Sequence, residues 1–227
     1  MSSAQAEQRH RLFRPRLSLG LRYTCRVQLR PSLGLACLCL ATACGPRPVV
    51  LGFWIEEVEY QSPRIGEPLT TTEFATIDRV ARAEIGRAFE DYDVTINDDR
   101  NARYKVAVLS RLKGERLIWG GTYAGESRAI AGFGGSGAVN FEYVANGAMV
   151  FASESASRAD IIDAIGRGVG RVTIHEFLHQ LLPKSPIHDS KDPRSYEGNS
   201  PALREGYFGD LHWGVAQPWL SGDLKRR

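Results

Sequence analysis

The sequence predicts an α+β domain, and three observations lead to this fold class. Short segments rich in β-branched and aromatic residues recur through the first two thirds of the 227-residue chain, as strands do. Two longer segments, 71–92 and 157–182, carry apolar residues at helical spacing. The length suits one domain with a sizeable core. Strands and helices are therefore expected in one body, with two main helices.

The first 44 residues have the composition of an export signal. Seven arginines and one acidic residue fall within residues 1–30, and an uncharged, mostly apolar run at 33–44 follows. That run is too short to span a bilayer but suits the apolar region of a signal peptide. Ala41-Thr42-Ala43 before Cys44 fits ordinary signal peptidase and also resembles a bacterial lipobox, in which the cysteine is lipidated.

The leader predicts where the protein is found. We expect residues 1–44 to be a signal peptide of the lipoprotein type and residues 45–227 to be the exported domain. A lipid on Cys44 would then anchor the protein to a membrane of the bacterial cell envelope.

Charge and cysteine content argue against two kinds of site. The formal net charge is +3, but the arginines of the leader account for it and the remaining chain is slightly acidic. Nothing therefore supports a nucleic-acid partner. All four cysteines lie at or before residue 44, so the domain has neither a disulfide framework nor a cysteine metal site.

The elements of the domain are expected in a simple order. Thr71 or Thr72 can cap the first helix, which runs to about Tyr92. The glycine-heavy stretch 120–137 lacks the lysine and hydroxyl of a phosphate-binding loop, so we expect a loop or a bulged edge strand over a cleft. Strand-like patterns cover 49–60, 93–96, 103–110, 116–122, 138–143 and 147–152.

The second main helix has clear signals at both ends. Ser157-Arg-Ala-Asp160 resembles a capping box, and Pro183 ends the helical pattern. Gly166, Gly168 and Gly170 lower its helix propensity, which indicates close packing of a neighbouring element.

That helix carries His175-Glu176-Phe177-Leu178-His179. Two histidines at positions i and i+4 lie one turn apart on one helix face, so their imidazoles can hold one ion. The glutamate between them can take a proton from a metal-bound water. The pattern predicts a zinc site with a third ligand further along the chain.

Three segments beyond this motif resemble the metzincin-like zinc peptidases of the matrixin and archaemetzincin type. Ile85–Tyr92 resembles the first helix of matrixin-like domains, with its alanine-phenylalanine pair and its terminal aromatic residue. Gly147–Phe151 occupies the place of the family's edge strand, which lines the substrate cleft. His188–Tyr196 resembles the stretch after the active-site helix. The resemblance covers about residues 50–200.

The resemblance implies a zincin-like mixed sheet, with His188 as the third zinc ligand. It also implies a tyrosine that stabilises the oxyanion, Tyr196 in the first place and Tyr207 in the second. The chain departs from the family pattern HExxHxxGxxH, because Leu182 and Ser185 hold the glycine and third-histidine positions and His188 comes three residues later. No methionine follows His188 to form the family's methionine turn.

A second family supplies an alternative third ligand. Residues 202–210 resemble the glutamate helix of the gluzincins, which would make Glu205 the ligand in place of His188.

Together these observations predict a zinc-dependent peptidase that acts on peptide or protein substrates. Zn²⁺ would be held by His175, His179 and His188, with Glu176 as general base and Tyr196 at the oxyanion. The alternative is a non-catalytic zinc-binding lipoprotein of the envelope. The intact Glu176 argues against it, because a structural zinc site does not need that carboxylate.

Overall fold

The computed structural model describes residues 46–110, 112, 124–130, 134–182 and 187–227. The leader with Cys44 and the whole strand expected at 116–122 lie outside the described residues. Among the described residues, no helix is both long enough and apolar enough to cross a bilayer.

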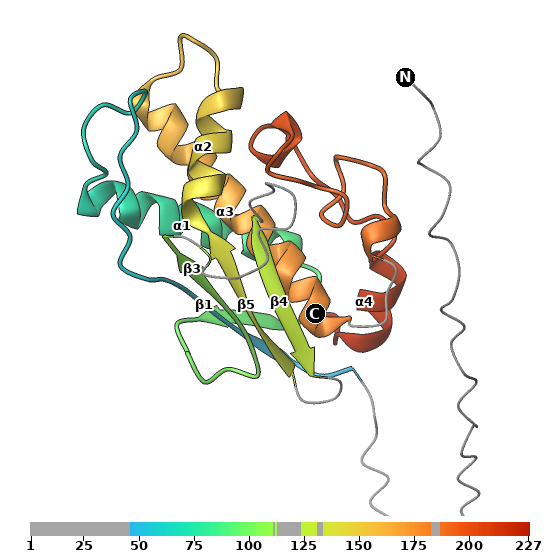
Figure 1. Ribbon diagram of the computed structural model, residues 1–227. Helices are drawn as coiled ribbons and strands as arrows, with labels where there is room; N and C mark the ends of the chain where they lie inside the picture. Colours follow the sequence, from blue (N-terminus) through green and yellow to red (C-terminus); the bar gives the residue numbers. More distant parts are fainter. Residues whose placement is uncertain (1–45, 111, 113–123, 131–133, 183–186) are drawn as a thin grey trace, which may run out of the picture. The chain divides into compact units, whose positions relative to one another are not determined.

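The described part of the chain is an α+β fold with a five-stranded mixed sheet and four α-helices (Figure 1). The strand order is β2-β1-β3-β5-β4, and all neighbours are parallel except β4 and β5. The strands are β1 (Val49–Ile55), β2 (Val94–Asn97), β3 (Tyr104–Leu109), β4 (Gly125–Ile130) and β5 (Gly134–Asn140). The helices are α1 (Thr71–Ala88), α2 (Phe141–Phe151), α3 (Arg158–Leu181) and α4 (Gln217–Asp223).

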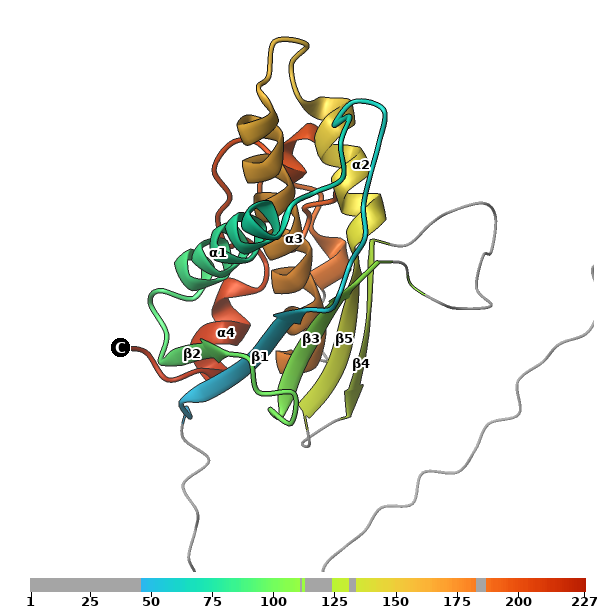
Figure 2. The ribbon, with the colours of Figure 1, turned by 90° about the vertical axis from the view of Figure 1, so that its left-hand side faces the viewer.

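Helices α1 and α3 lie on the same side of the sheet (Figure 2). Val106 and Val108 alternate with more exposed residues along β3 and are fully buried, as expected for a strand with one covered face. Helix α3 packs against α1 and against β3, β4 and β5. A Cβ atom on Gly166 would lie 2.6 Å from the Cβ of Val80 in α1. The expectation of close packing at the glycines of α3 is thus confirmed.

The two main helices begin with the same kind of cap. Ser157 caps α3 and forms the expected capping box with Asp160. The N-cap of α1 is Thr70 rather than Thr71 or Thr72, because Thr70 and Glu73 satisfy each other's backbone N–H groups. Helix α1 also ends earlier than expected, at Ala88.

The expected strand at 147–152 was wrong. Residues 141–151 form α2, with Asn140 as N-cap accepting a hydrogen bond from the Tyr143 N–H at 3.1 Å. The buried residues recur at helical spacing, but a short apolar run does not distinguish a helix from a strand in sequence. Gly147–Phe151 is therefore not the edge strand beside the cleft.

The edge strand comes instead from the glycine-heavy stretch. Part of it forms β4 and part forms β5, which pair in antiparallel register with Ser127 opposite Gly137. Residues 131–133 lie outside the described residues. Strand β4 ends the sheet on the side where α3 carries the two histidines.

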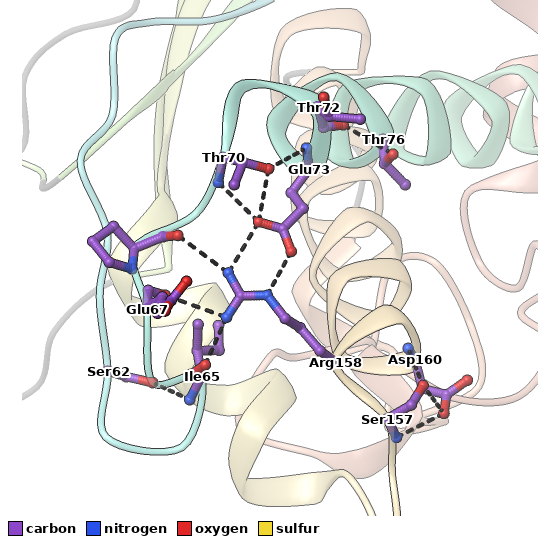
Figure 3. Close-up of polar contacts among 11 residues, drawn as sticks. Ser62, Ile65, Glu67, Thr70, Thr72, Glu73, Thr76, Ser157, Arg158 and Asp160 are labelled. Atoms are coloured by element: carbon purple, nitrogen blue, oxygen red, sulfur yellow. Dashed lines mark hydrogen bonds and ion pairs between the residues drawn. The ribbon is translucent and has the colours of Figure 1, made fainter.

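A polar hub joins the beginnings of α1 and α3 (Figure 3). The Arg158 guanidinium donates twice to the Glu73 carboxylate, at 2.5 and 3.0 Å. Its remaining N–H groups donate to the carbonyls of Ile65, Glu67 and Pro68. All five donors of the guanidinium are thereby used.

Candidate metal centre

Three imidazoles converge at the C-terminal end of α3. His175 and His179 lie one turn apart on the helix, and His188 reaches them from a 3₁₀ turn, Ile187–Asp189. The ring centroids are 4.8 to 5.3 Å apart. One potential ligand atom from each residue lies within 4.8 Å of the other two. This is the one group of its kind within the described ranges.

The structure brings His188, and not Glu205, to the histidine pair. Glu205 lies in a separate 3₁₀ turn, and its backbone carbonyl accepts a hydrogen bond of 2.7 Å from Arg171. Arg171 is itself buried and paired with Glu84 at 2.9 Å. Glu205 therefore belongs to a structural contact on another side of α3.

The surroundings keep the helix histidines neutral. Burial, followed by the nearby His179 and His188, lowers the pKa of His175 to about 4. Burial and then His188 lower the pKa of His179 as well. The neutral imidazole is the form that binds a metal ion, so this environment favours ligation near neutral pH.

Glu176 is a buried carboxyl group without a hydrogen-bond partner at one oxygen. Its exposed fraction is 4%, and its Oε2 atom has no partner within the described part of the chain. Burial, with a smaller contribution from Glu126, raises its pKa to about 8. The carboxyl group packs against the backbone of Gly125 in β4, where an added Cβ would lie 2.4 Å from Oε1. A side chain at this position would therefore require the Glu176 carboxyl group to move.

Hydrogen bonds fix α3 against the sheet beside this carboxyl group. The Ser127 hydroxyl of β4 donates to the backbone carbonyl of Glu176 at 3.1 Å. Gln180, one turn after Glu176, donates to Ser127 at 2.9 Å and to the Lys105 carbonyl at 3.0 Å. Its own oxygen accepts from the Lys105 N–H at 3.0 Å. The helix and the edge strand therefore hold the site as one unit.

The metal-ligand group opens into a cleft of about 1030 Å³. The cleft lies between the edge strand, the end of α3 and the loop after it. Its lining comprises 124–128 of β4 and its approach, Val172, His175, Glu176, His179, His188, Ser190 and 197–201. The three histidines and Glu176 face this cleft.

Buried polar atoms without a partner gather at the same place. Within the described residues they are Thr173 Oγ1, His175 Nδ1, Glu176 Oε2 and Asn199 Oδ1. Three of these four residues line the cleft. Such atoms are few in native proteins, and their concentration at one cleft indicates a site whose partners come from a ligand.

The two tyrosines expected at the oxyanion are held elsewhere. Tyr196 is 3% exposed, its ring packs on Trp213 at 4.7 Å, and burial raises its pKa to about 12. The Tyr207 hydroxyl donates to the Pro201 carbonyl at 2.8 Å. Neither residue is part of the cleft lining. The structure does not bring them to the metal-ligand group.

Two residues of the site have no signal in the sequence. Asn199 and Glu197 line the cleft from the polar segment after His188, about a third of the way from that histidine to the C-terminal helix. Nothing in their local pattern distinguishes them from loop residues, because they reach the cleft through long-range packing.

The donor set fits a metal ion. Three imidazoles suit zinc, copper, iron or nickel. Imidazole nitrogens around one tetrahedral zinc ion lie about 3.4 Å apart, a spacing that small side-chain rotations can reach from the observed one. With three protein ligands and an open cleft, the group has the form of a catalytic rather than a closed structural site.

The comparisons with known proteins found nothing: no family model, no curated protein and no solved structure matches the chain.

Proposed function

We propose that this protein is a zinc-dependent peptidase of zincin-like fold. His175, His179 and His188 would hold the metal ion, and Glu176 would act as general base. The observation that carries the proposal is the buried Glu176 carboxyl group, whose Oε2 has no partner among the described residues, beside three convergent imidazoles in an open cleft. A structural zinc site has no use for such a group.

Zinc, when bound, would polarise the substrate carbonyl and increase the acidity of a water molecule in the cleft. Glu176 would take a proton from the attacking water at the Oε2 atom that has no partner in the protein. It would then deliver that proton to the leaving amine. The fixed backbone of Gly125 on one side keeps the carboxyl group in place during both steps.

Strand β4 supports a peptide as the substrate. It is the edge strand of the sheet and contributes to the cleft lining over residues 125–128. An exposed edge offers backbone N–H and C=O groups with which an extended peptide can pair. A peptide paired with β4 in this way would extend past the three histidines.

Asn199 is our candidate for the oxyanion partner, in place of Tyr196 and Tyr207. It is an amide side chain in the cleft lining, and its Nδ2 group can donate a hydrogen bond to an oxyanion. Amide groups of this kind stabilise developing oxyanions. We expect Asn199→Ala to lower kcat by about 10²-fold and to leave metal content unchanged. Loss of metal instead would make Asn199 a part of the metal site.

The test of the function compares the wild type with Glu176→Gln. We expect both proteins to contain one equivalent of zinc by elemental analysis, with hydrolysis of a mixed peptide library by the wild type alone. A zinc-loaded wild type that cleaves no peptide of the library would contradict the peptidase and favour the non-catalytic zinc-binding lipoprotein. Equal hydrolysis by both proteins would show that Glu176 is not the general base.

The third ligand is tested by His188→Ala and Glu205→Ala. We expect His188→Ala to lose zinc and Glu205→Ala to retain it, because the structure brings only the former side chain to the histidine pair. The reverse result would favour the gluzincin-type alternative.

We also propose that the protein is exported and anchored through a lipid on Cys44, because residues 33–44 have the composition of a lipoprotein signal. Expression of the full chain in bacteria with a labelled fatty acid tests this. The label should be incorporated into the wild type and not into Cys44→Ser. An unlabelled wild type would contradict the lipid anchor.

A further inference from the structure

Two oppositely charged side chains lie on the edge strand β4 beside the cleft. Glu126 and Arg128 are both exposed, and both line the cleft. Neither side chain makes a hydrogen bond or an ion pair in the part of the chain that the structure describes. Apart from the histidines, Arg128 is the one basic residue among the described lining residues. The proposed hydrolysis uses neither charge, so both are available to a substrate.

The pleat of β4 puts these two charges on one face of the strand. Gly125 lies against the carboxyl group of Glu176, and the Ser127 hydroxyl donates to the Glu176 carbonyl, so these two residues face α3. Successive side chains of a strand point to opposite faces. Glu126 and Arg128 therefore share the face directed away from α3, about 7 Å apart along the strand.

The hydrogen-bond register of β4 fixes how a peptide can meet them. The Asn140 N–H of β5 donates to the Ala124 carbonyl at 2.8 Å, and the two strands are antiparallel. The alternation of the ladder then directs the backbone groups of Gly125 and Ser127 away from β5, toward the free edge. An extended peptide at this edge would pair with those groups. Its residues opposite the two charged residues would occupy non-hydrogen-bonded positions, where side chains of paired strands are closest.

A second hollow makes the surroundings of Glu126 negative. Glu126 lines this hollow of about 770 Å³ as well as the cleft. Its lining contains four further glutamates, Glu56, Glu57, Glu59 and Glu142. Glu56 is paired with Arg100 at 3.1 Å, whereas Glu57 and Glu59 are exposed and have no ion pair within the described ranges. A basic group is therefore favoured beside Glu126.

We propose that Glu126 and Arg128 select peptide substrates by charge. The substrate carries an acidic residue opposite Arg128 and a lysine or arginine opposite Glu126, because cross-strand pairs of opposite charge are favourable and like charges are not. Antiparallel pairing is the more stable arrangement per residue, and it places the acidic residue two positions before the basic one. The inference rests on the peptide substrate of the proposed function and defines its charge.

Peptide binding to zinc-loaded Glu176→Gln tests this preference separately from hydrolysis. Two peptides of equal composition carry Asp-Ala-Lys or Lys-Ala-Asp at the centre of an otherwise uncharged sequence. We expect the Asp-Ala-Lys peptide to bind about three- to tenfold more tightly at low salt. High salt should reduce the difference, because it screens exposed charges. The wild type should rank the two peptides in the same order by kcat/KM.

An exchange of the two charges provides the sharper test. In the Glu176→Gln background, Glu126→Lys/Arg128→Glu keeps the net charge and should reverse the preference to Lys-Ala-Asp. Arg79→Glu/Glu90→Lys is the matched control, because it exchanges two exposed charges outside the cleft lining. This control should keep the original preference. If the first exchange does not fold, Arg128→Gln replaces it and should reduce the difference in affinity by about threefold.

The outcomes separate charge selection from the peptidase. Equal affinity for the two peptides, or no binding of either, would overturn the selection. The same holds for a preference for Lys-Ala-Asp before the exchange, and for an unchanged preference after it. Hydrolysis of both peptides at equal rates would overturn the selection and leave the peptidase intact. Tighter binding of Asp-Ala-Lys, together with a wild type that cleaves neither peptide, would support the selection while the peptidase fails.

Discussion

The two ends of α3 differ in whether their buried polar groups have hydrogen-bond partners. At the beginning, all five donors of Arg158 have acceptors, and the carboxylate of Glu73 accepts from both Arg158 and Thr70. At the end, His175 and Glu176 each bury a polar atom without a partner. One helix therefore joins a satisfied structural hub to an unsatisfied site.

This difference in hydrogen bonding affects the free energy of unfolding. A buried polar group without a hydrogen bond costs about 1–3 kcal/mol of stability. The hub avoids this cost because protein groups pair with protein groups. The cleft bears it at several atoms, which is consistent with a site where a ligand supplies the missing partners. The hub should thus be essential for stability and the cleft for function.

The largest expected effect comes from Glu176→Gln. We expect peptide hydrolysis to fall by about 10²- to 10⁴-fold, because the proton acceptor is lost. The metal-free variant should be as stable as the wild type or more stable near neutral pH. Burial raises the pKa of Glu176 to about 8, so folding must protonate this carboxyl group, a cost that a neutral amide does not carry. Peptide kinetics and thermal unfolding measure the two effects. A clear loss of stability would show that Glu176 makes a stabilising contact in the protein. The two ends of α3 would then not differ in the way described above.

Gly125→Ala should have the next largest effect. The new Cβ would lie 2.4 Å from Oε1 of Glu176, so the carboxyl group must move while the ligands remain. We expect kcat to fall by about 10²-fold, because a small displacement of a catalytic group has an effect of this size. The zinc content should not change. Gly86→Ala in α1 is the control, because nothing lies within 4 Å of its added Cβ. Equal kcat for both variants would contradict the positioning of Glu176 by β4.

Arg158→Ala should act on stability alone. The Arg158–Glu73 ion pair is partly exposed, with 35% of the Arg158 side chain and 21% of the Glu73 side chain accessible to solvent. Its contribution to stability is therefore less than that of a fully buried ion pair. We expect the variant to unfold at a lower urea concentration than the wild type. Co²⁺ affinity of the folded variant should equal that of the wild type. Weaker metal binding would show that the two ends of α3 are coupled.

The pH dependence of the hub should give the smallest effect. Hydrogen bonds from Arg158, and then from the Thr70 backbone, lower the pKa of Glu73 from 4.5 to about 2. A folded-state pKa below the unfolded value means that the stabilisation is full above pH 4.5 and is lost as the pH falls toward 2. The difference in unfolding free energy between wild type and Glu73→Gln should therefore shrink between pH 6 and pH 3. A constant difference in unfolding free energy over that pH range would contradict the lowered pKa of Glu73.

Local patterns predicted much of the fold. The capping box at Ser157 and the strand at 104–109 follow from residues close together in the chain, and both are confirmed. Residues 147–151 show the limit of this reasoning, because a short apolar run fits a helix as well as a strand. For the glycine-heavy stretch, the edge-strand alternative of the prediction is confirmed, because β4 ends the sheet and lines the cleft, but the pairing of β4 with β5 was not predicted. The glycines of this stretch serve the close approach of α3 to β4 and β5, which no local pattern reveals.

The sequence by itself determined that two histidines and a glutamate occupy one turn of a capped helix, because the helical repeat fixes the spacing of i and i+4. Only the tertiary structure decided how the site is completed. It brought His188 to the pair, kept Glu205 at the Arg171 contact, made β4 the edge of the cleft and placed Glu197 in the cleft lining. These are contacts between elements far apart in the chain, and packing rather than local periodicity sets them.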